Sequence, residues 1–260
     1  MVWREKSNYV IQTVSNALDV LDQFYAGVDE IGVTELSKKL KLHKNNVFRL
    51  LATLEARGYI EQNKATENYR LGSRCLQLGQ TYLHQLGFLQ QARLTLKELA
   101  KSTKESAFVT LRRGMEIVPL DFVEPESAVR VVSFLGVALP VHCTAPGKVH
   151  LAFESEEELK ERLPESLARY TDKTIVDRSQ LLAQIKEVSD GGFAVDRGEF
   201  IEDVCCVAVP VQDYARSLVG SLAVAGPVHR LPSERMEKEI LPRLQESGRD
   251  LSRRLGFQGK

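Results

Sequence analysis

The chain has 260 residues, 43% of them hydrophobic and 27% charged, which is typical of a globular protein with one large domain or two ordinary ones. Its 35 basic and 35 acidic side chains cancel, which excludes a whole-protein electrostatic attraction to nucleic acid, and four cysteines are too few for a disulfide framework. Apolar runs stay short of the roughly 20 residues of a spanning helix, and the charged start lacks a signal-peptide pattern. We therefore expect a cytoplasmic protein with reduced thiols and no membrane partner.

The N-terminal segment has the periodicity of an amphipathic helix. Apolar residues recur at three- and four-residue steps from Ile11 to Tyr25, and the predicted helix ends near Gly27. A second, short helix is predicted to begin at Thr34, whose side chain can cap free backbone N–H groups. Residues 41–44 then form a predicted turn.

The third predicted helix extends from about Lys44 to Arg57 and ends at Gly58, a residue that readily adopts the left-handed conformation of a helix C-terminus. It presents one apolar face, formed by Val47, Leu50, Leu51 and Leu54. After Gly58 the pattern indicates two short strands, at 59–60 and 69–71, around a polar turn. This order predicts a winged helix-turn-helix, in which the last helix enters the major groove of DNA. Six basic residues against two acidic ones between Thr34 and Arg57 give this segment a local positive charge.

The rest of the chain predicts a linker helix and a mixed domain. We divide the chain into a DNA-binding domain at 1–71, a linker helix at 72–87 and an effector domain at 88–260. Strands are predicted at 106–111, 117–123, 129–134, 192–195, 204–211 and 218–225, and helices at 88–101, 145–153, 156–163, 180–191 and 233–255. Long connections between the strands favour the α/β (α+β) class, with a sheet backed by helices.

Six sequence segments together resemble the IclR family of bacterial regulators. They occur in the order and spacing of that family and cover nearly the whole chain: Thr34–Ile60, Tyr69–Gly72, Pro140–Lys148, Gly192–Asp196, Cys206–Val211 and Gly226–Pro227. The resemblance implies an N-terminal winged helix, a GAF-like effector domain with an antiparallel sheet, and a homodimer or dimer of dimers on DNA. We therefore expect a ligand-responsive transcriptional regulator, a repressor rather than an activator.

The start of the third helix carries the candidate DNA-reading side chains, namely His43, Lys44, Asn45, Asn46 and Arg49. Asparagine can pair with adenine at two points, and lysine or arginine with guanine or phosphate. Arg49, together with Lys64 and Arg70 near the wing, is the better candidate for phosphate. The alternative is that the first three residues solvate a turn and cap a helix. Because one such unit contacts few base pairs, we expect two copies on a palindromic operator of double-stranded DNA.

The candidate effector site lies around the turn that precedes the helix at 145–153. Backbone N–H groups there can bind an anionic ligand, or Gly147 can simply satisfy backbone geometry. The resemblance implies contacts from Thr144, Ala145, Gly147, Asp196, Cys206, Ala223 and Ala225. Family members that bind small hydrophilic acids tend to have serines where this chain has its last two alanines. Because a wall without hydroxyls suits apolar ligands, we expect an organic acid with an apolar or aromatic part.

The competing hypotheses are an enzyme and a thiol-based redox or metal sensor. The pairs His142–Cys143 and Cys205–Cys206 supply an imidazole and thiols, which are nucleophile components. Adjacent residues on a strand point to opposite faces, however, so that His142 is badly placed to activate Cys143. The chain contains no phosphate loop, GxSxG, HExxH or paired metal-ligand motif. We expect no catalytic residue, no metal and no cofactor.

Overall fold

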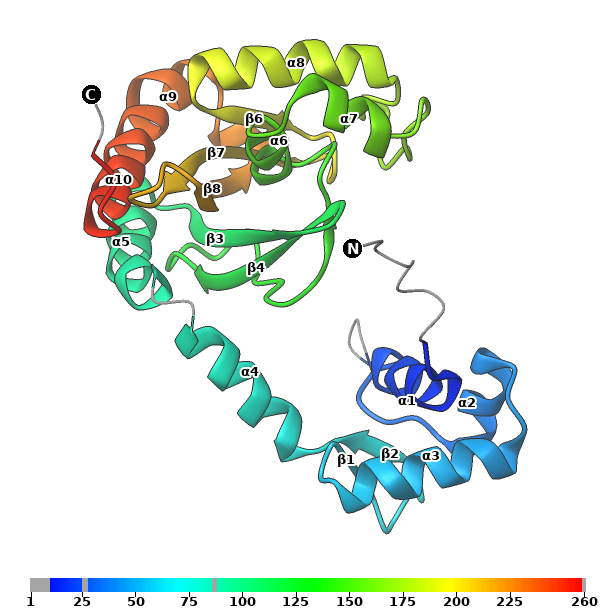
Figure 1. Cartoon of the computed structure of the whole chain (residues 1–260). Helices are drawn as coiled ribbons and strands as arrows, with labels where there is room; N and C mark the ends of the chain where they lie inside the picture. Colours follow the sequence, from blue (N-terminus) through cyan, green and yellow to red (C-terminus); the bar gives the residue numbers. More distant parts are fainter. Residues whose placement is uncertain (1–9, 25–27, 86–87, 259–260) are drawn as a thin grey trace. The chain divides into compact units, whose positions relative to one another are not determined.

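The structure is a computed structural model that describes residues 10–24, 28–85 and 88–258. It divides into two compact units, Met1–Gln85 and Leu86–Lys260 (Figure 1). No helix within the described residues is long and apolar enough to cross a membrane. The finer division into 1–71, 72–87 and 88–260 stays a prediction.

The first unit is a winged helix-turn-helix followed by one more helix, as predicted. Its elements are α1 (Gln12–Asp22), α2 (Val33–Leu40), α3 (Lys44–Ala56), β1 (Ile60–Gln62), β2 (Tyr69–Leu71) and α4 (Ser73–Gln85). Strands β1 and β2 form an antiparallel hairpin, and Ile31 adds a bridge to Tyr69. Helix α1 ends at Asp22, so the predicted end near Gly27 is wrong. Residues 25–27 lie outside the described residues, as do the predicted linker residues 86 and 87.

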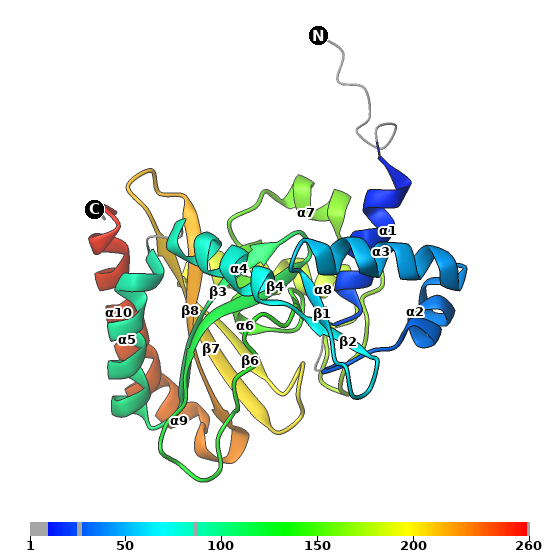
Figure 2. The ribbon, with the colours of Figure 1, turned by 90° about the horizontal axis from the view of Figure 1, so that it is seen from below.

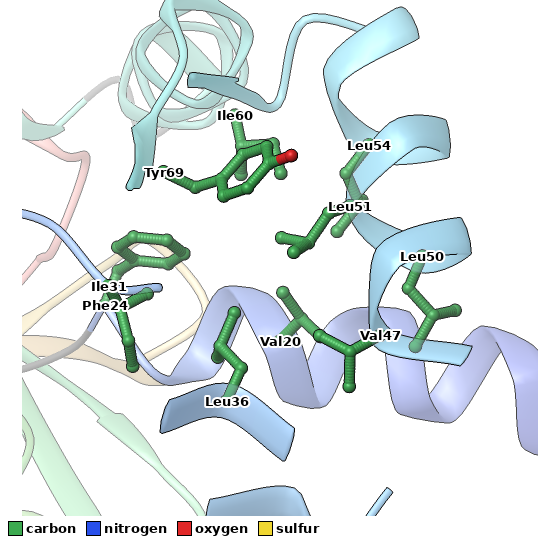
Figure 3. Close-up of a cluster of buried hydrophobic side chains, with 10 residues drawn as sticks. All are labelled: Val20, Phe24, Ile31, Leu36, Val47, Leu50, Leu51, Leu54, Ile60 and Tyr69. Carbon is green, nitrogen blue, oxygen red and sulfur yellow. The ribbon is translucent and has the colours of Figure 1, made fainter. Parts of the chain in front are cut away.

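A compact apolar core holds α3 against the rest of this unit. The four predicted inward residues of α3 are at most 8% exposed and face side chains from α1, α2 and the hairpin, including Val20, Leu36, Ile60 and Tyr69 (Figure 3). Gly58 follows α3 with φ +76°, the left-handed conformation predicted for it. Its carbonyl accepts a hydrogen bond from the N–H of Arg74, which ties the start of α4 to the end of α3.

Two details of the predicted helix-turn-helix are wrong. Helix α2 begins one residue early, at Val33, with Gly32 at the capping position and no side-chain cap, so Thr34 does not cap it. The turn comprises residues 41–43, because Lys44 already belongs to α3. Lys41 has φ 54°, and this left-handed residue ends α2 in the way that glycine usually does.

The second unit contains one curled antiparallel sheet of six strands with helices on both faces, which confirms the α+β prediction. The strands are β3 (Ser106–Arg113), β4 (Glu116–Val123), β5 (Leu139–Pro140), β6 (Ala194–Arg197), β7 (Val204–Gln212) and β8 (Leu218–Pro227), in the order β5-β4-β3-β8-β7-β6. The helices are α5 (Phe88–Thr103), α6 (Ala145–Leu151), α7 (Glu156–Arg162), α8 (Arg178–Gly191), α9 (Ser233–Arg235) and α10 (Leu241–Arg254). Helices α5 and α10 pack against β3, β4, β7 and β8 on one face of the sheet, and α6 packs against β7 and β8 on the other (Figure 2).

The strand predicted at 129–134 is absent, and this prediction is wrong. Its alternating apolar residues form a loop beside β4, and the edge of β4 pairs instead with the short β5 through Ile117 and Leu139. The hydroxyl of Ser106 donates to the carbonyl of Val131 at 2.6 Å and holds the loop. In this loop the alternation of apolar and polar residues instead directs some of the apolar side chains toward an internal cavity.

The predicted helix at 233–255 is continuous but irregular. Between α9 and α10 the segment Met236–Ile240 is π-helical, directly before Pro242. Proline lacks an N–H and its ring collides with the carbonyl four residues earlier, so a wider turn ahead of it relieves the clash.

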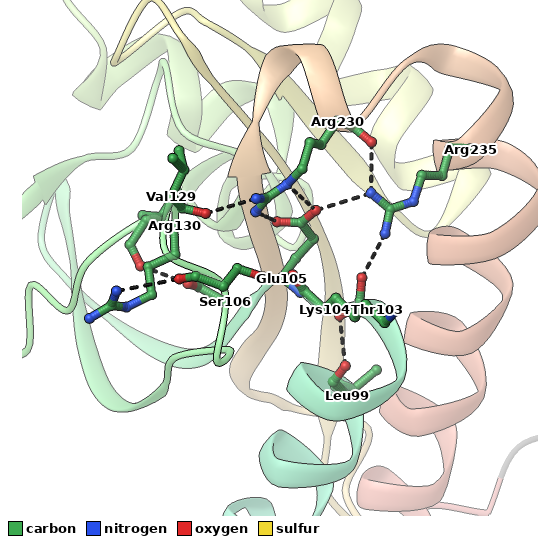
Figure 4. A network of polar contacts seen from close by, with 11 residues as sticks. Leu99, Thr103, Lys104, Glu105, Ser106, Val129, Arg130, Arg230 and Arg235 are labelled. Atoms are coloured by element: carbon green, nitrogen blue, oxygen red, sulfur yellow. Dashed lines mark hydrogen bonds and ion pairs between the residues drawn. The ribbon is translucent and has the colours of Figure 1, made fainter.

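A buried carboxylate ties the start of the sheet to the chain that follows β8. Glu105 is 1% exposed and pairs with both Arg230 and Arg235 (Figure 4). The same guanidinium groups donate to the carbonyls of Val129 and Thr103, each at 2.7 Å. This network joins the start of the sheet, the segment that follows β8 and the loop at 124–138.

Candidate functional site

The exposed side of α3 is the candidate nucleic-acid surface. All five predicted residues at its start, His43, Lys44, Asn45, Asn46 and Arg49, are exposed, while the four apolar residues of its other side are buried. The helical period alone produces this division, because residues three and four positions apart share a face. The structure therefore brings the predicted residues together on and beside one exposed helix face.

These side chains have no hydrogen-bond or ion-pair partner among the described residues. His43 is the capping residue of α3, with extended backbone, but its side chain makes no capping bond. The amides of Asn45 and Asn46 and the cations of Lys44 and Arg49 likewise make no bond to described residues. Donors and acceptors on this face are thus available to an external partner.

The predicted wing residues lie in the β1–β2 hairpin. Lys64 is exposed in its turn, where the amide of Asn63 and the hydroxyl of Thr66 donate to the carboxylate of Glu30 at 2.6 and 2.7 Å. These hydrogen bonds lower the pKa of Glu30. Arg70 is engaged in a cross-strand ion pair with Glu61 at 2.7 Å, in which both side chains are about half exposed. Because such exposed pairs contribute only about 0–1 kcal/mol, Arg70 remains able to exchange this partner for phosphate.

One exposed residue of α3 was not singled out from the sequence. Phe48 is 56% exposed and lies among the polar side chains of the outer face. The signal was present, since Phe48 falls outside the apolar period of Val47, Leu50, Leu51 and Leu54.

The second candidate site is a cavity inside the second unit, which we call the effector unit. Its walls come from the sheet, the loop at 124–138, the start of α6 and the turn after β6, namely Phe108, Ile117, Val131, Phe134, Leu139, Thr144, Pro146, Asp196, Phe200, Ile201, Val204, Cys206 and Ala225. The lining contains three phenylalanines but no lysine or arginine. The chemical character of this lining is that of a site for a largely apolar molecule.

Two aromatic rings of this lining, Phe108 and Phe134, pack against each other and against Phe122. Phe108 and Phe122 stack with centroids 5.2 Å apart, and Phe134 meets both rings edge-on at 5.6 and 5.2 Å. Such offset and edge-to-face contacts add to the burial of the rings. These contacts join the sheet to the loop that supplies Phe134.

Asp196 is the one ionisable carboxyl group in the lining. It is 4% exposed, and burial, together with the negative charge of the neighbouring Glu199, raises the pKa of its carboxyl group to about 7. Its Oδ1 accepts the backbone N–H of Glu199 at 2.7 Å. Near neutral pH the group can thus accept a hydrogen bond from a ligand or, when protonated, donate one.

A buried ion pair stands beside Asp196. The ammonium group of Lys148, fully buried on α6, donates to the carboxylate of Glu199, whose Oε2 has no partner among the described residues. The sequence pattern did not indicate this pair, because the two residues are far apart in the chain. Lys148 compensates part of the negative charge behind the cavity.

The predicted effector residues separate into two groups. Thr144, Asp196, Cys206 and Ala225 line the cavity, whereas Ala145, Gly147 and Ala223 are buried and are not part of its lining. Thr144 caps α6, since its Oγ1 accepts the N–H of Gly147 at 3.3 Å. A Cβ on Gly147 would come within 2.2 Å of the carbonyl oxygen of Val141, so this glycine permits a close packing of helix and turn.

The groups considered for catalysis do not form a nucleophile pair. His142 and Cys143 lie in the turn before α6, not on a strand as predicted, and His142 Nε2 bonds to the carbonyl of Ala168 at 2.9 Å. All four cysteines are free, and burial raises the pKa of the Cys143 thiol to about 12 and of the Cys205 thiol to about 11. Burial also raises the pKa of Cys206, and in the part of the chain that is described no three His, Cys, Asp or Glu side chains cluster as for a metal ion.

Comparisons with known families match both units. Residues 13–64 match the model described as the IclR helix-turn-helix domain, and residues 80–253 match that of the bacterial transcriptional regulator IclR C-terminal domain. The chain is 32% identical to the HTH-type transcriptional regulator XynR of Escherichia coli K12 over 95% of this chain and 98% of the relative. It is 28% identical to the HTH-type transcriptional repressor AllR of the same strain over 95% and 91%.

Solved structures agree with this result. A regulator structure from Silicibacter sp. TM1040 superposes with a TM-score of 0.83 at 31% identity, covering 95% of this chain and 98% of the other. An IclR homologue from Microbacterium hydrocarbonoxydans, solved in complex with 4-hydroxybenzoate, has a TM-score of 0.83 at 18% identity, with coverages of 94% and 99%. The second likeness concerns the fold alone.

Proposed function

The chain belongs to the IclR family of bacterial transcriptional regulators, and we propose from this premise that it is a repressor whose DNA affinity responds to an organic acid. As a member of this family it is a helix-turn-helix regulator that binds DNA, and not an enzyme. One observation carries the finer proposal. The same chain combines a helix, α3, whose exposed polar side chains have no partner among the described residues, with an apolar cavity that contains a single buried carboxyl group.

For DNA we propose that α3 enters the major groove. Asn45 and Asn46 have free amides that suit adenine, and Lys44 suits guanine or phosphate. Arg49, Lys64 and Arg70 contact phosphates, and His43 approaches the same groove from the turn. The side chains on α3 and His43 have no partner among the described residues, and Arg70 has only its exposed pair with Glu61, which supports the assignment.

For the effector we propose a carboxylic acid with an aromatic or sizeable apolar part. The cavity offers aromatic rings and aliphatic side chains over most of its surface, and Ala225 lies on its wall without a hydroxyl group. A small hydrophilic acid would leave its polar atoms unpaired there, at a cost of about 1–3 kcal/mol each. A protonated Asp196 is the group that we expect to meet a ligand carboxylate, with Thr144 and Cys206 beside it.

We propose that two copies of the chain assemble on a palindromic operator. Apolar side chains at and directly before α1 are left uncovered in the first unit, with Ile11 66%, Val14 55% and Leu18 56% exposed. Leu76 of α4 is 65% exposed as well. A second copy that covers such residues would bury apolar area that a single chain exposes to water. A dimer of dimers is compatible with the same proposal.

We expect the protein to repress transcription and the effector to relieve this repression. The similarity to AllR, a relative named as a repressor, supports this expectation. Ligand binding need change operator affinity by only about 5- to 150-fold, equivalent to a coupling of about 1–3 kcal/mol. We propose that α4 transmits this change between the units.

A thiol-based redox sensor is the second candidate, but burial and raised pKa values make the effector-domain thiols poor thiolates. An unchanged ligand response in a Cys206→Ser variant under reducing and oxidising conditions would reject it.

The experiment is a fluorescence-anisotropy titration of the intact chain with DNA from upstream of its own gene, at several salt concentrations. The Asn46→Ala, Arg49→Ala double variant should lose binding, whereas Arg113→Ala, at an exposed effector-domain site, should not. Adding 4-hydroxybenzoate should weaken the complex more than glyoxylate does. Binding unaffected by the double variant would reject the proposed reading surface, and a stronger response to glyoxylate would reject the proposed effector class.

A further inference from the structure

The exposed face of α3 contains one large apolar side chain among its polar ones. Phe48 is 56% exposed, whereas the other large apolar residues of α3, from Val47 to Leu54, are at most 8% exposed. The ring therefore adds nothing comparable to the core of the folded unit. Isolated exposed apolar residues are ordinary, so its position on the helix has to carry the argument.

Phe48 lies among the residues that would face a bound duplex. It is three residues after Asn45 and four before Ala52, so the helical period places all three on the same outer face. Arg49 is its direct neighbour. Because the side chain of Ala52 is small, the next turn of the helix projects little beyond its backbone. Another surface can therefore approach the ring closely.

The chemistry of this face matches one kind of base pair. In the major groove an A·T pair presents the N7 acceptor and N6 donor of adenine beside the 5-methyl group of thymine. An asparagine amide satisfies the first two, and an apolar side chain packs on the methyl group. Guanine and cytosine offer no methyl group there.

We propose that Phe48 reads thymine, by packing its ring against a thymine 5-methyl group in the major groove. This inference rests on the proposed entry of α3 into that groove. It gives a role in sequence preference to an apolar residue, in addition to the polar side chains proposed above. Thymine is then selected next to the adenine that Asn45 reads.

The test removes the methyl group from the DNA and the ring from the protein, separately and together. A duplex is selected from random-sequence DNA with the full chain, and each thymine in it is replaced in turn by deoxyuridine, which lacks only the methyl group. Affinities are measured for the wild type, Phe48→Asn and Phe48→Leu. Phe153→Ala, which removes a 44% exposed phenylalanine from the effector unit, is the matched control.

The wild type should lose about fourfold in affinity at one thymine of each half-site, the effect of one buried methyl group. Phe48→Asn should bind thymine and uracil duplexes equally, Phe48→Leu should retain part of the preference, and the control should retain all of it. A wild type that binds the selected duplex but discriminates at no thymine, or a Phe48→Asn variant that discriminates as before, would overturn this inference alone. A chain that selects no DNA would overturn the proposed reading surface together with it.

Discussion

The backbone N–H of Glu199 donates a hydrogen bond of 2.7 Å to the carboxyl group of Asp196, on the wall of the effector cavity. This bond favours the ionised carboxylate, but burial outweighs it and raises the pKa of Asp196 to about 7. The carboxyl group of Asp196 therefore changes its protonation state near neutral pH, and the stability of the protein should depend on pH in that range.

Asp196→Asn should remove a pH-dependent loss of stability. Because the folded pKa lies above the unfolded value of 3.8, the native state binds more protons, and its stability falls as pH rises from about 4 through 7. The wild type should lose about 2 kcal/mol between pH 5.5 and pH 8 through this group, and the variant should not. Urea denaturation at both pH values measures the difference, with the exposed Asp190→Asn as control. Parallel pH profiles for wild type and Asp196→Asn would contradict the assignment.

Lys148→Met should destabilise the effector unit by about 3–5 kcal/mol, because it leaves the carboxylate of Glu199 buried without its cation. Replacing both residues, as Lys148→Met with Glu199→Gln, should recover most of this loss. Chemical denaturation of the two single variants and the double variant forms the cycle. Strictly additive losses would mean that the pair contributes no coupling.

Gly147→Ala should destabilise the protein by about 1–3 kcal/mol or more, since the new Cβ would lie 2.2–2.6 Å from backbone atoms of Val141 that cannot move aside. Gly79 in α4 has no heavy atom within 4 Å of the corresponding position. Gly79→Ala should therefore stabilise its helix by up to about 1 kcal/mol. Thermal melting of both variants gives the comparison, and equal shifts in Tm would refute the packing role of Gly147.

The Val14→Glu, Leu18→Glu double variant should remain folded but dissociate the proposed dimer. Both side chains are more than half exposed in the single chain, so charges there cost little until a partner covers them. Loss of the second reading helix should weaken binding to a palindrome by about 100-fold or more. Sedimentation analysis gives the mass, and Gln12→Glu with Thr13→Glu supplies the same charges at polar positions of α1. If the double variant still has the mass of a dimer, α1 is not part of the interface.

Ala225→Ser should shift the ligand preference toward smaller, more polar acids. The hydroxyl group would stand on the cavity wall, where the ring of an aromatic ligand offers it no acceptor, whereas the smaller glyoxylate could place an oxygen there. Calorimetric titration with 4-hydroxybenzoate and glyoxylate should show the aromatic acid weakened about fivefold or more. Ala223→Ser changes a buried residue that is not part of the lining and is expected to leave the preference intact.

The first unit could be predicted almost completely from the sequence because its determinants are local. The change of period after Gly58 and the apolar face of α3 need only neighbouring residues, and both agree with the structure. The boundary of α2 was less certain, since the backbone of Gly32, rather than the hydroxyl of Thr34, starts the helix. A capping side chain is a sufficient signal for a helix start but not a necessary one.

In the effector unit the errors arise where partners are distant in sequence. Alternation from Val129 to Phe134 has the period of a strand, yet a strand needs a neighbour, and β4 pairs with the short β5 instead. The spacing of apolar residues in the sequence determines which side chains point in the same direction, but not which residues they pack against. For the same reason the pair of Lys148 and Glu199 left no signal in the sequence, whereas Thr144 and Asp196 were placed at the cavity only through the family resemblance.

The pairing of β3 with β8 has a consequence for the order in which the chain can fold. Ser106 at the start of the sheet pairs with Ala225 near its end, so the centre of the sheet joins the first and last long strands of the domain. A chain leaving the ribosome N-terminus first presents the whole winged helix, whose contacts are local, long before β8 exists. During synthesis the part that reads DNA can thus be complete while the cavity still lacks a wall, and slow translation of the last segment would prolong the lifetime of a regulator that is unable to sense its effector.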